Sequence, residues 1–245
     1  MKVPTEDHFL NGSIVARQPR KGFRSGLDAV MLAAAVPANV DDDVLELGCG
    51  AGVASLCLAA RCRPVRITGI EVLSELAGLA EANARINGME QYLRFVTGDA
   101  LALPPLLRRD YDHVFSNPPF HDDSGEKSPR DERALALSDG ARLGDWLSAG
   151  IRRVRSQGTF TAILRADRLS EALAHLPGQG VALFPLWPRT GEVAKRVIIQ
   201  VRKGSRAPLA LRPGLVLHES DGRYTPAAAA VLRDGGSLAL WSRPL

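Results

Sequence analysis

The stretch Glu46-Leu47-Gly48-Cys49-Gly50-Ala51-Gly52 decides the fold of this chain. It follows a short apolar run that begins at Val44 and leads into an Ala- and Leu-rich run that ends at Arg61. This order predicts a strand, a tight turn and a helix. Glycines let the backbone turn sharply, and the helix N-terminus offers free N–H groups to an anion. The dinucleotide-binding pattern G-x-G-x-x-G needs glycine where the chain has Val53, which disfavours a nicotinamide-dependent dehydrogenase.

Strands and helices alternate outward from this turn. We expect further strands at 65–72, 92–97, 111–116 and 158–164, and helices at 74–87, 143–155 and 168–176. Ser74 is expected to cap the first of these helices, and Gly88 to end it. This alternation predicts parallel β-α-β units.

The end of the chain breaks the alternation. Residues 180–187 and 192–201 have the pattern of two strands whose connection is too short for a crossover helix, so we expect an antiparallel hairpin. Extended structure at 209–218 and a short helix at 225–232, opened by Thr225-Pro226, should follow. The predicted fold is α/β and Rossmann-like, with a mostly parallel seven-stranded sheet and an antiparallel C-terminal hairpin.

Composition excludes several classes of protein. The 245 residues are 45% hydrophobic and 24% charged, which is typical of a folded globular chain rather than a disordered one. No apolar run is long enough to suggest a membrane span, and no secretory signal is visible, so we expect a cytoplasmic protein. The three cysteines and five histidines lack metal-ligand spacing. A net charge of +4 permits a nucleic-acid partner.

Polar groups follow the next two predicted strands. Glu71 ends one strand, where a carboxylate can accept both hydroxyls of a ribose. Asp99 follows another, where its carboxylate can accept a hydrogen bond from an adenine amino group and the N–H of Ala100 can reach a ring nitrogen. The ends of parallel strands meet at one edge of the sheet, so these groups and the glycine turn predict a nucleoside site.

The segment Ser116-Asn117-Pro118-Pro119-Phe120 follows the fourth predicted strand. Two prolines fix the backbone and leave nearby carbonyls as acceptors, to which Asn117 adds its side-chain oxygen. Such acceptors can hold both N–H groups of an exocyclic amine and orient its lone pair for reaction. Phe120 can stack on a planar base.

These two motifs resemble those of known enzymes. The glycine turn resembles motif I of the class I S-adenosylmethionine-dependent methyltransferases. Asn117-Pro118-Pro119-Phe120 resembles the (N/D/S)-P-P-(Y/F) motif of the amino-methyltransferases. Families with this motif methylate adenine N6, guanine N2 or a glutamine side-chain amide, so the motif leaves the substrate open.

Other segments resemble the bacterial tRNA1(Val) adenine-37 N6-methyltransferase family. They are residues 22–33, 185–189, 194–197, 213–219 and 224–226, and the likeness covers about residues 8–240. The resemblance implies an N-terminal extension at 1–40 that packs near the cofactor, and a methyltransferase domain at 41–245. It also implies S-adenosylmethionine as cofactor and tRNA as partner.

The motifs and the resemblance together predict the site. Asn117, Pro118, Pro119 and Phe120 are the expected catalytic residues. The expected cofactor-binding residues are Glu46, Gly48, Gly50, Gly52, Glu71, Val72, Asp99, Ala100, Asn117 and Arg24. No metal site and no membrane contact are expected, and the oligomeric state stays open.

Expected RNA contacts lie elsewhere. The polar segment 121–133 leaves the site directly and is a candidate substrate contact. Basic residues gather at Arg17, Arg20, Lys21 and Arg24, and again at Arg189, Lys195, Arg196, Arg202, Lys203 and Arg206, where they could meet phosphates. Arg152, Arg153 and Arg155 could instead complement a helix dipole.

The leading hypothesis is a methyltransferase for adenine N6 in tRNA. Guanine N2 of ribosomal RNA and a protein glutamine remain as alternative substrates. A silent module that binds cofactor or RNA without methyl transfer is the hypothesis outside the enzymes, and the intact Asn-Pro-Pro-Phe segment argues against it.

Overall fold

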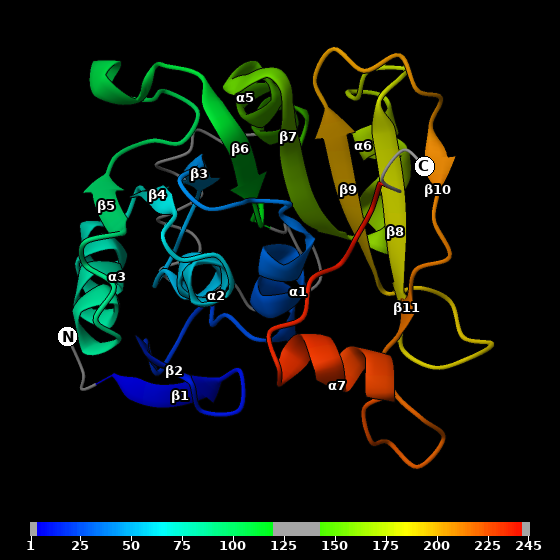
Figure 1. The fold of residues 1–245 in the computed structure, drawn as a ribbon, viewed down its shortest axis with the longest axis horizontal. Helices are drawn as coiled ribbons and strands as arrows, with labels where there is room; N and C mark the ends of the chain where they lie inside the picture. Colours follow the sequence, from blue (N-terminus) through cyan, green and yellow to red (C-terminus); the bar gives the residue numbers. More distant parts are fainter. Residues whose placement is uncertain (1–3, 120–142, 242–245) are drawn as a thin grey trace.

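The strands predicted around the glycine turn lie in one large sheet in the computed structural model, which describes residues 4–119 and 143–241 (Figure 1). Within these residues the order across the sheet is β10-β8-β9-β7-β6-β3-β4-β5, and β11 also pairs with β8. The seven longer strands are β3 (Asp43–Leu47), β4 (Arg66–Glu71), β5 (Leu93–Thr97), β6 (Tyr111–Ser116), β7 (Val154–Arg165), β8 (Val181–Trp187) and β9 (Arg196–Arg202). β10 (Ala210–Leu211) and β11 (Leu215–Val216) extend the sheet by two residues each.

Strand directions confirm the expected mixture. β5, β4, β3, β6 and β7 are parallel to their neighbours within this group. β9 runs antiparallel to both β7 and β8, between which it lies. The last hairpin therefore inserts its second strand into the middle of the sheet rather than adding it at the edge.

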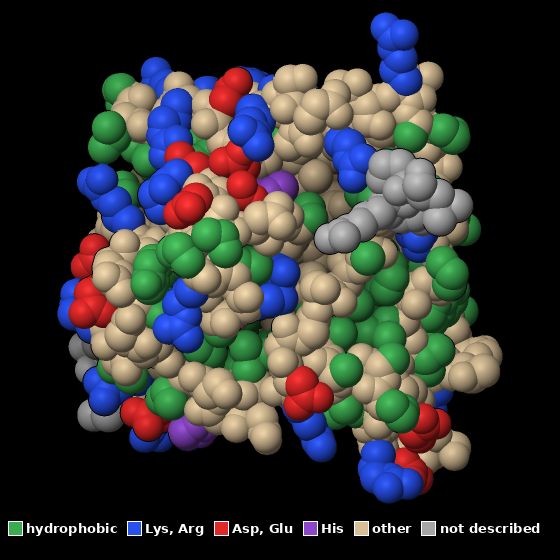
Figure 2. Space-filling view, in the orientation of Figure 1, with side chains coloured by type: hydrophobic (Ala, Val, Ile, Leu, Met, Phe, Trp, Pro, Cys, Tyr) green, Lys and Arg blue, Asp and Glu red, His purple; other side chains and the backbone are tan. Residues whose placement is uncertain are grey.

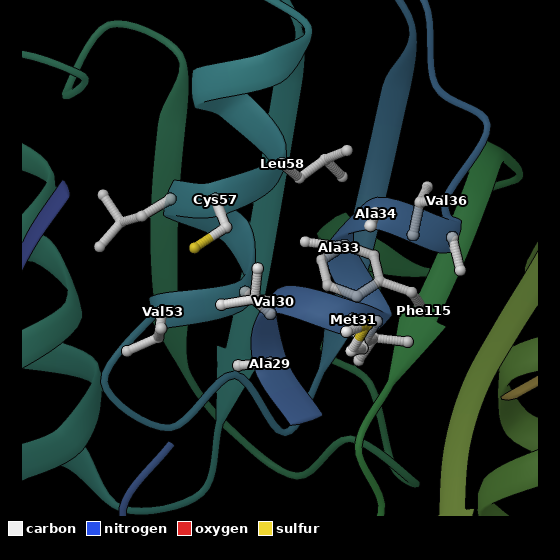
Figure 3. Close-up of a cluster of buried hydrophobic side chains, with 14 of the residues drawn as sticks. Ala29, Val30, Met31, Ala33, Ala34, Val36, Val53, Cys57, Leu58 and Phe115 are labelled. Atoms are coloured by element: carbon white, nitrogen blue, oxygen red, sulfur yellow. The ribbon is translucent and has the colours of Figure 1, made fainter. Parts of the chain in front are cut away.

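Helices cover both faces of the sheet. One apolar core lies under α1 (Leu27–Ala35), α2 (Val53–Arg61), α3 (Ser74–Ile86) and α7 (Pro226–Leu232). The other lies under α5 (Leu143–Arg152) and α6 (Leu169–Leu173). In the first core α1 and α2 pack side by side over Phe115 of β6 (Figure 3). Parallel strands covered on both faces are buried on both sides, as β3 is from Val44 to Leu47.

The N-terminal residues form elements that the sequence pattern did not specify. β1 (Thr5–Phe9) and β2 (Ile14–Gln18) make an antiparallel hairpin. The side chain of Asn87 bonds both backbone groups of Val15, and Asn83 bonds both of Arg17, so two amides at α3 and its C-terminal end fix the hairpin to the domain. Whether residues 1–40 pack near the cofactor stays a prediction.

α1 is completed by residues from the far end of the sequence. Its last turn leaves carbonyl oxygens without helical partners. Ala35 O accepts from the Gln200 amide at 2.8 Å, and Ala34 O accepts from Leu238 N at 2.8 Å. α7 packs against α1 as well (Figure 1). The first helix is thus held by the last third of the chain.

Several predicted boundaries need correction. Leu73, not Ser74, is the N-cap of α3, and it makes no side-chain cap bond. The helix predicted at 143–155 ends at Arg152, because Val154 pairs with Tyr111 and already belongs to β7. The helix predicted at 168–176 covers only Leu169–Leu173. The predicted stop at Gly88 is confirmed by its φ of 62°, and Thr225 caps α7 by accepting from Ala228 N.

Candidate active site

The carboxyl ends of four parallel strands are aligned by their register. Leu47 of β3 pairs with Ile70 of β4 on one side and with Ser116 of β6 on the other. Glu71 pairs with Thr97 of β5. The segments that follow these strands therefore meet at one edge of the sheet, as the sequence predicted. This edge is where ligands bind in open α/β sheets.

The glycine turn is built for close contacts. Gly48, Gly50 and Gly52 have positive φ values of 70°, 55° and 79°. A Cβ on Gly48 would lie 3.0 Å from the Trp146 ring, and one on Gly52 would lie 2.9 Å from Phe95. A Cβ on Gly50 would meet nothing within 4 Å. Gly48 and Gly52 thus serve packing, whereas the backbone at Gly50 borders open space.

Glu71 ties three turns together. Its Oε2 accepts from Gly50 N at 2.9 Å and its Oε1 from Leu73 N at 3.0 Å, while its carbonyl accepts from Gly98 N at 2.9 Å. Burial raises the pKa of the Glu71 carboxyl, and these backbone N–H groups oppose that rise. Each carboxylate oxygen keeps a further lone pair, so the expected bonds to ribose hydroxyls stay compatible with this geometry.

Asn117 carries an unsatisfied acceptor. The residue is half-buried, and its Oδ1 is fully buried with no hydrogen-bond partner among the described residues. Before it, the Ser116 hydroxyl donates to Leu47 O at 2.9 Å, and after it Pro118 is buried. A buried polar atom without a partner is costly, so it marks a place where a ligand group can bind. Pro119 is exposed, and Phe120 and 121–133 lie outside the described residues.

Comparisons with known proteins agree with this geometry. The methyltransferase small domain family model matches residues 26–137. A tRNA1(Val) (adenine(37)-N6)-methyltransferase of Shewanella baltica is 26% identical, over 87% of this chain and 92% of the relative. The ribosomal RNA small subunit methyltransferase C of Salmonella arizonae is 31% identical, over 48% of this chain and 33% of the relative.

A solved structure extends the likeness to the fold. The crystal structure of protein Atu636 from Agrobacterium tumefaciens, a predicted O-methyltransferase, has a TM-score of 0.71 and 24% identity. The alignment covers 89% of this chain and all of that one. These likenesses support an S-adenosylmethionine-dependent methyltransferase with a Rossmann-like fold. The predicted fold and enzyme class are confirmed.

Glu46 of this methyltransferase lies beneath the glycine turn. Its side chain is buried, and its carboxyl accepts a hydrogen bond from the Ser55 hydroxyl of α2. Burial raises the pKa of Glu46 to about 8, with a smaller rise from Glu71. A neutral carboxyl that joins β3 to α2 supports the turn from below.

Asp99 and its neighbours lie where the sequence placed them. The Asp99 Oδ1 accepts from Leu101 N at 2.8 Å, which orders the loop after β5 and leaves the second oxygen for another partner. Ala100 is buried, and Val72 is half-buried beside Glu71. Their contacts with the cofactor stay predictions.

Arg24 is paired within the N-terminal segment. Its guanidinium contacts both carboxylate oxygens of Asp7, at 2.6 and 2.7 Å. The pair joins the β1–β2 hairpin to the segment before α1. A role of Arg24 at the cofactor stays a prediction.

Two residues of the site were not predicted from the sequence. Trp146 of α5 packs its ring on Gly48, and its Nε1 is buried without a partner among the described residues. Asn83 of α3 donates to Ala51 O of the glycine turn at 2.9 Å while it holds Arg17. A buried polar residue on the apolar face of a predicted helix is the signal that could have pointed to Asn83.

The second basic cluster is divided between two ends of the sheet. Arg196 pairs with Arg165 at the carboxyl end of β7, and its guanidinium bonds Asp28 at 2.8 Å. Arg202 pairs with Thr159 near the opposite end, so Lys203 and Arg206 also follow that end. These basic residues therefore do not form one continuous surface.

The described part of the chain holds neither a group of His, Cys, Asp and Glu suited to a metal ion nor a helix long and apolar enough to cross a membrane. Cys49, Cys57 and Cys62 are buried free thiols.

Proposed function

We propose that this methyltransferase modifies the N6 amine of an adenine in tRNA. The observation that carries the proposal is the buried Asn117 Oδ1, which has no partner among the described residues and follows directly on the strand end beside the glycine turn. The substrate class is supported by relatives named as tRNA adenine-N6 methyltransferases, which match along most of the chain.

Asn117 positions the amine. The lone pair of an exocyclic amine is delocalised into the ring, so the amine is a poor nucleophile. An acceptor fixed by Pro118 and by the Ser116–Leu47 bond can bind one N–H group and turn the lone pair out of the ring plane. No strong base is needed, because the amine becomes acidic only as the new bond forms.

Residues around the glycine turn would hold S-adenosylmethionine. Glu71 would accept the ribose hydroxyls and Asp99 the adenine amino group, with Gly50 leaving room for the amino-acid part. The unpartnered Asn117 oxygen and the open space over Gly50 fit such a group. When bound, the cofactor supplies a methyl group on a positively charged sulfur.

The experiment uses purified protein, labelled S-adenosylmethionine and RNA from a strain that lacks the gene. We expect label in N6-methyladenosine of the tRNA fraction. Label in N2-methylguanosine of ribosomal RNA would contradict the adenine assignment, and label that resists ribonuclease would contradict an RNA substrate altogether. Cofactor binding without label in RNA would contradict an RNA substrate and move the search to protein substrates.

Guanine N2 of ribosomal RNA is the second candidate. It is favoured by the 31% identity to the Salmonella ribosomal RNA enzyme, although that likeness spans one third of the relative. The same nucleoside analysis separates the two bases.

A further inference from the structure

A cavity of about 240 Å³ extends away from the strand ends of the candidate site. Leu101, Leu103 and their alanine neighbours form one wall, between β5 and β6. Arg108, Arg152 and Arg153 line it as well. Because Val154 pairs with Tyr111 at the start of β6, the arginines at the end of α5 stand at the opposite end of that strand from Asn117.

These three arginines differ from neighbouring arginines in that they have no carboxylate partner among the described residues. Arg109 is paired with Asp43, and Arg155 with Asp112. In the upper left of Figure 2, Lys and Arg side chains lie beside Asp and Glu side chains. Among the described residues no carboxylate contacts the cavity arginines, and none lines the cavity. The arginines inside the cavity therefore remain available to an external anion.

Among the described residues, one hydrogen bond holds a side chain of these three arginines. Arg108 Nε donates to Leu103 O at 2.6 Å, which fixes the guanidinium while its two terminal nitrogens stay available. Another residue binds the carbonyl oxygens at the C-terminus of α5. Lys203 Nζ donates to Arg152 O at 3.2 Å and to Val154 O, just after the helix, at 2.5 Å. Complementing the helix dipole is thus not the main task of Arg152 and Arg153.

We propose that this cavity binds a backbone phosphate of the RNA substrate. A planar guanidinium matches the geometry of a phosphate, and several arginines without acids make a strong site for one. The cavity begins at Ala100, at the edge of the predicted adenine contact, so RNA bound there can continue towards Asn117. The proposal rests on the proposed RNA substrate.

The test compares binding of unmodified total tRNA by the wild type and by Arg152→Ala/Arg153→Ala over a salt series. We expect the dissociation constant to rise about tenfold or more. The slope of log affinity against log salt should become shallower by roughly 0.7–0.9 for each phosphate that the variant no longer neutralises. The affinity for the cofactor should not change.

Two further variants serve as a control and as an independent test of the cavity. Arg85→Ala removes an arginine from the last turn of α3, over the other face of the sheet, and should leave tRNA binding unchanged. Arg152→Glu changes one exposed position, so it tests the cavity should the double variant fold poorly, and it should weaken tRNA binding because it reverses a charge there.

Each remaining outcome contradicts the proposal in a recognisable way. Unchanged tRNA affinity in both cavity variants would overturn it while leaving the RNA substrate intact. Lower cofactor affinity would assign the cavity to the cofactor. Equal tRNA affinity combined with thermal stabilisation of the wild type alone by inorganic phosphate would indicate a free-phosphate site. No tRNA binding by the wild type would overturn the proposed function itself.

Discussion

Asn117 is held by its neighbours rather than by its own side-chain oxygen. The Ser116 hydroxyl is bonded to Leu47 O and Pro118 is buried, whereas the Asn117 oxygen has no partner among the described residues. Leaving a buried acceptor unpaired costs about 1–3 kcal/mol of folding free energy. The fold therefore tolerates a local loss of stability at the position where a substrate amine is expected to bind.

The unpaired oxygen of Asn117 leads to a prediction for Asn117→Ala. Turnover should fall by roughly 10²-fold or more, the scale of losing one preorganised polar group. The melting temperature should not fall, because the substitution removes an unpaired buried oxygen. Ser116→Ala is the matched control, since it breaks a formed bond and should lower stability by about 1 kcal/mol. Wild-type turnover in Asn117→Ala would remove the residue from the mechanism.

Glu46 predicts a dependence of stability on pH. Burial raises its pKa in the folded state from 4.5 to about 8, so between these values the folded chain holds a proton that the unfolded chain releases. Stability from this group is present at low pH and is lost as the pH rises, by on the order of 5 kcal/mol in total.

Glu46→Gln should remove most of this loss. A glutamine can still accept from Ser55 but cannot lose a proton. Urea unfolding between about pH 6 and pH 9 should show a smaller decline for the variant than for the wild type. Parallel curves for the two proteins would mean that Glu46 ionises normally.

At the scale of elements, two glycines in helices have opposite surroundings. Gly150 of α5 lies against Phe160 of β7, and a Cβ there would overlap the ring. Gly78 of α3 is exposed, and a Cβ there would meet nothing within 4 Å. The first glycine lets α5 approach the sheet, and the second only loosens its helix.

Alanine substitutions should therefore differ in sign. Gly150→Ala should destabilise the fold by roughly 1–3 kcal/mol through overpacking. Gly78→Ala should stabilise it by about 0.5–1 kcal/mol, because alanine is the better helix former. Chemical denaturation of both variants measures the difference, and destabilisation by Gly78→Ala would contradict open surroundings at that position.

The helices and strands show which parts of the fold could be predicted from the sequence. The glycine turn, the alternating strands and the final hairpin were predictable because each follows from apolar periodicity and turn residues nearby in the sequence. The α5–β7 boundary was not, because Val154 becomes a strand residue only through its pairing with Tyr111. In the site, the motif residues were predictable, whereas Trp146 and Asn83 depend on contacts between distant segments.

At the scale of the whole molecule, Asn83 joins three parts. It lies in α3, bonds both backbone groups of Arg17 in the N-terminal hairpin, and donates to Ala51 O of the glycine turn. Asn87, one turn later, bonds the same hairpin through Val15, and its side-chain nitrogen also donates to Asn83 O. Both asparagines therefore attach the hairpin, whereas Asn83 also supports the glycine turn.

Asn83→Ala and Asn87→Ala should both release the hairpin. We expect faster hydrogen exchange at residues 5–18 in both, and roughly 1–3 kcal/mol less stability where buried partners are left unpaired. Only Asn83→Ala should also weaken cofactor binding, measured by calorimetry. Equal cofactor affinities in the two variants would show that the turn does not depend on Asn83.

The attachment of α1 to the end of the chain matters for how the protein is made. α1 is synthesised well before its partners Gln200, Leu238 and α7, and Gln200 follows Ala35 by 165 residues. At elongation rates of about 5–20 residues per second, this helix waits roughly 10–40 s for them. The apolar side of α1 stays uncovered during this time, so we expect chaperones to bind the nascent chain until these partners have been synthesised.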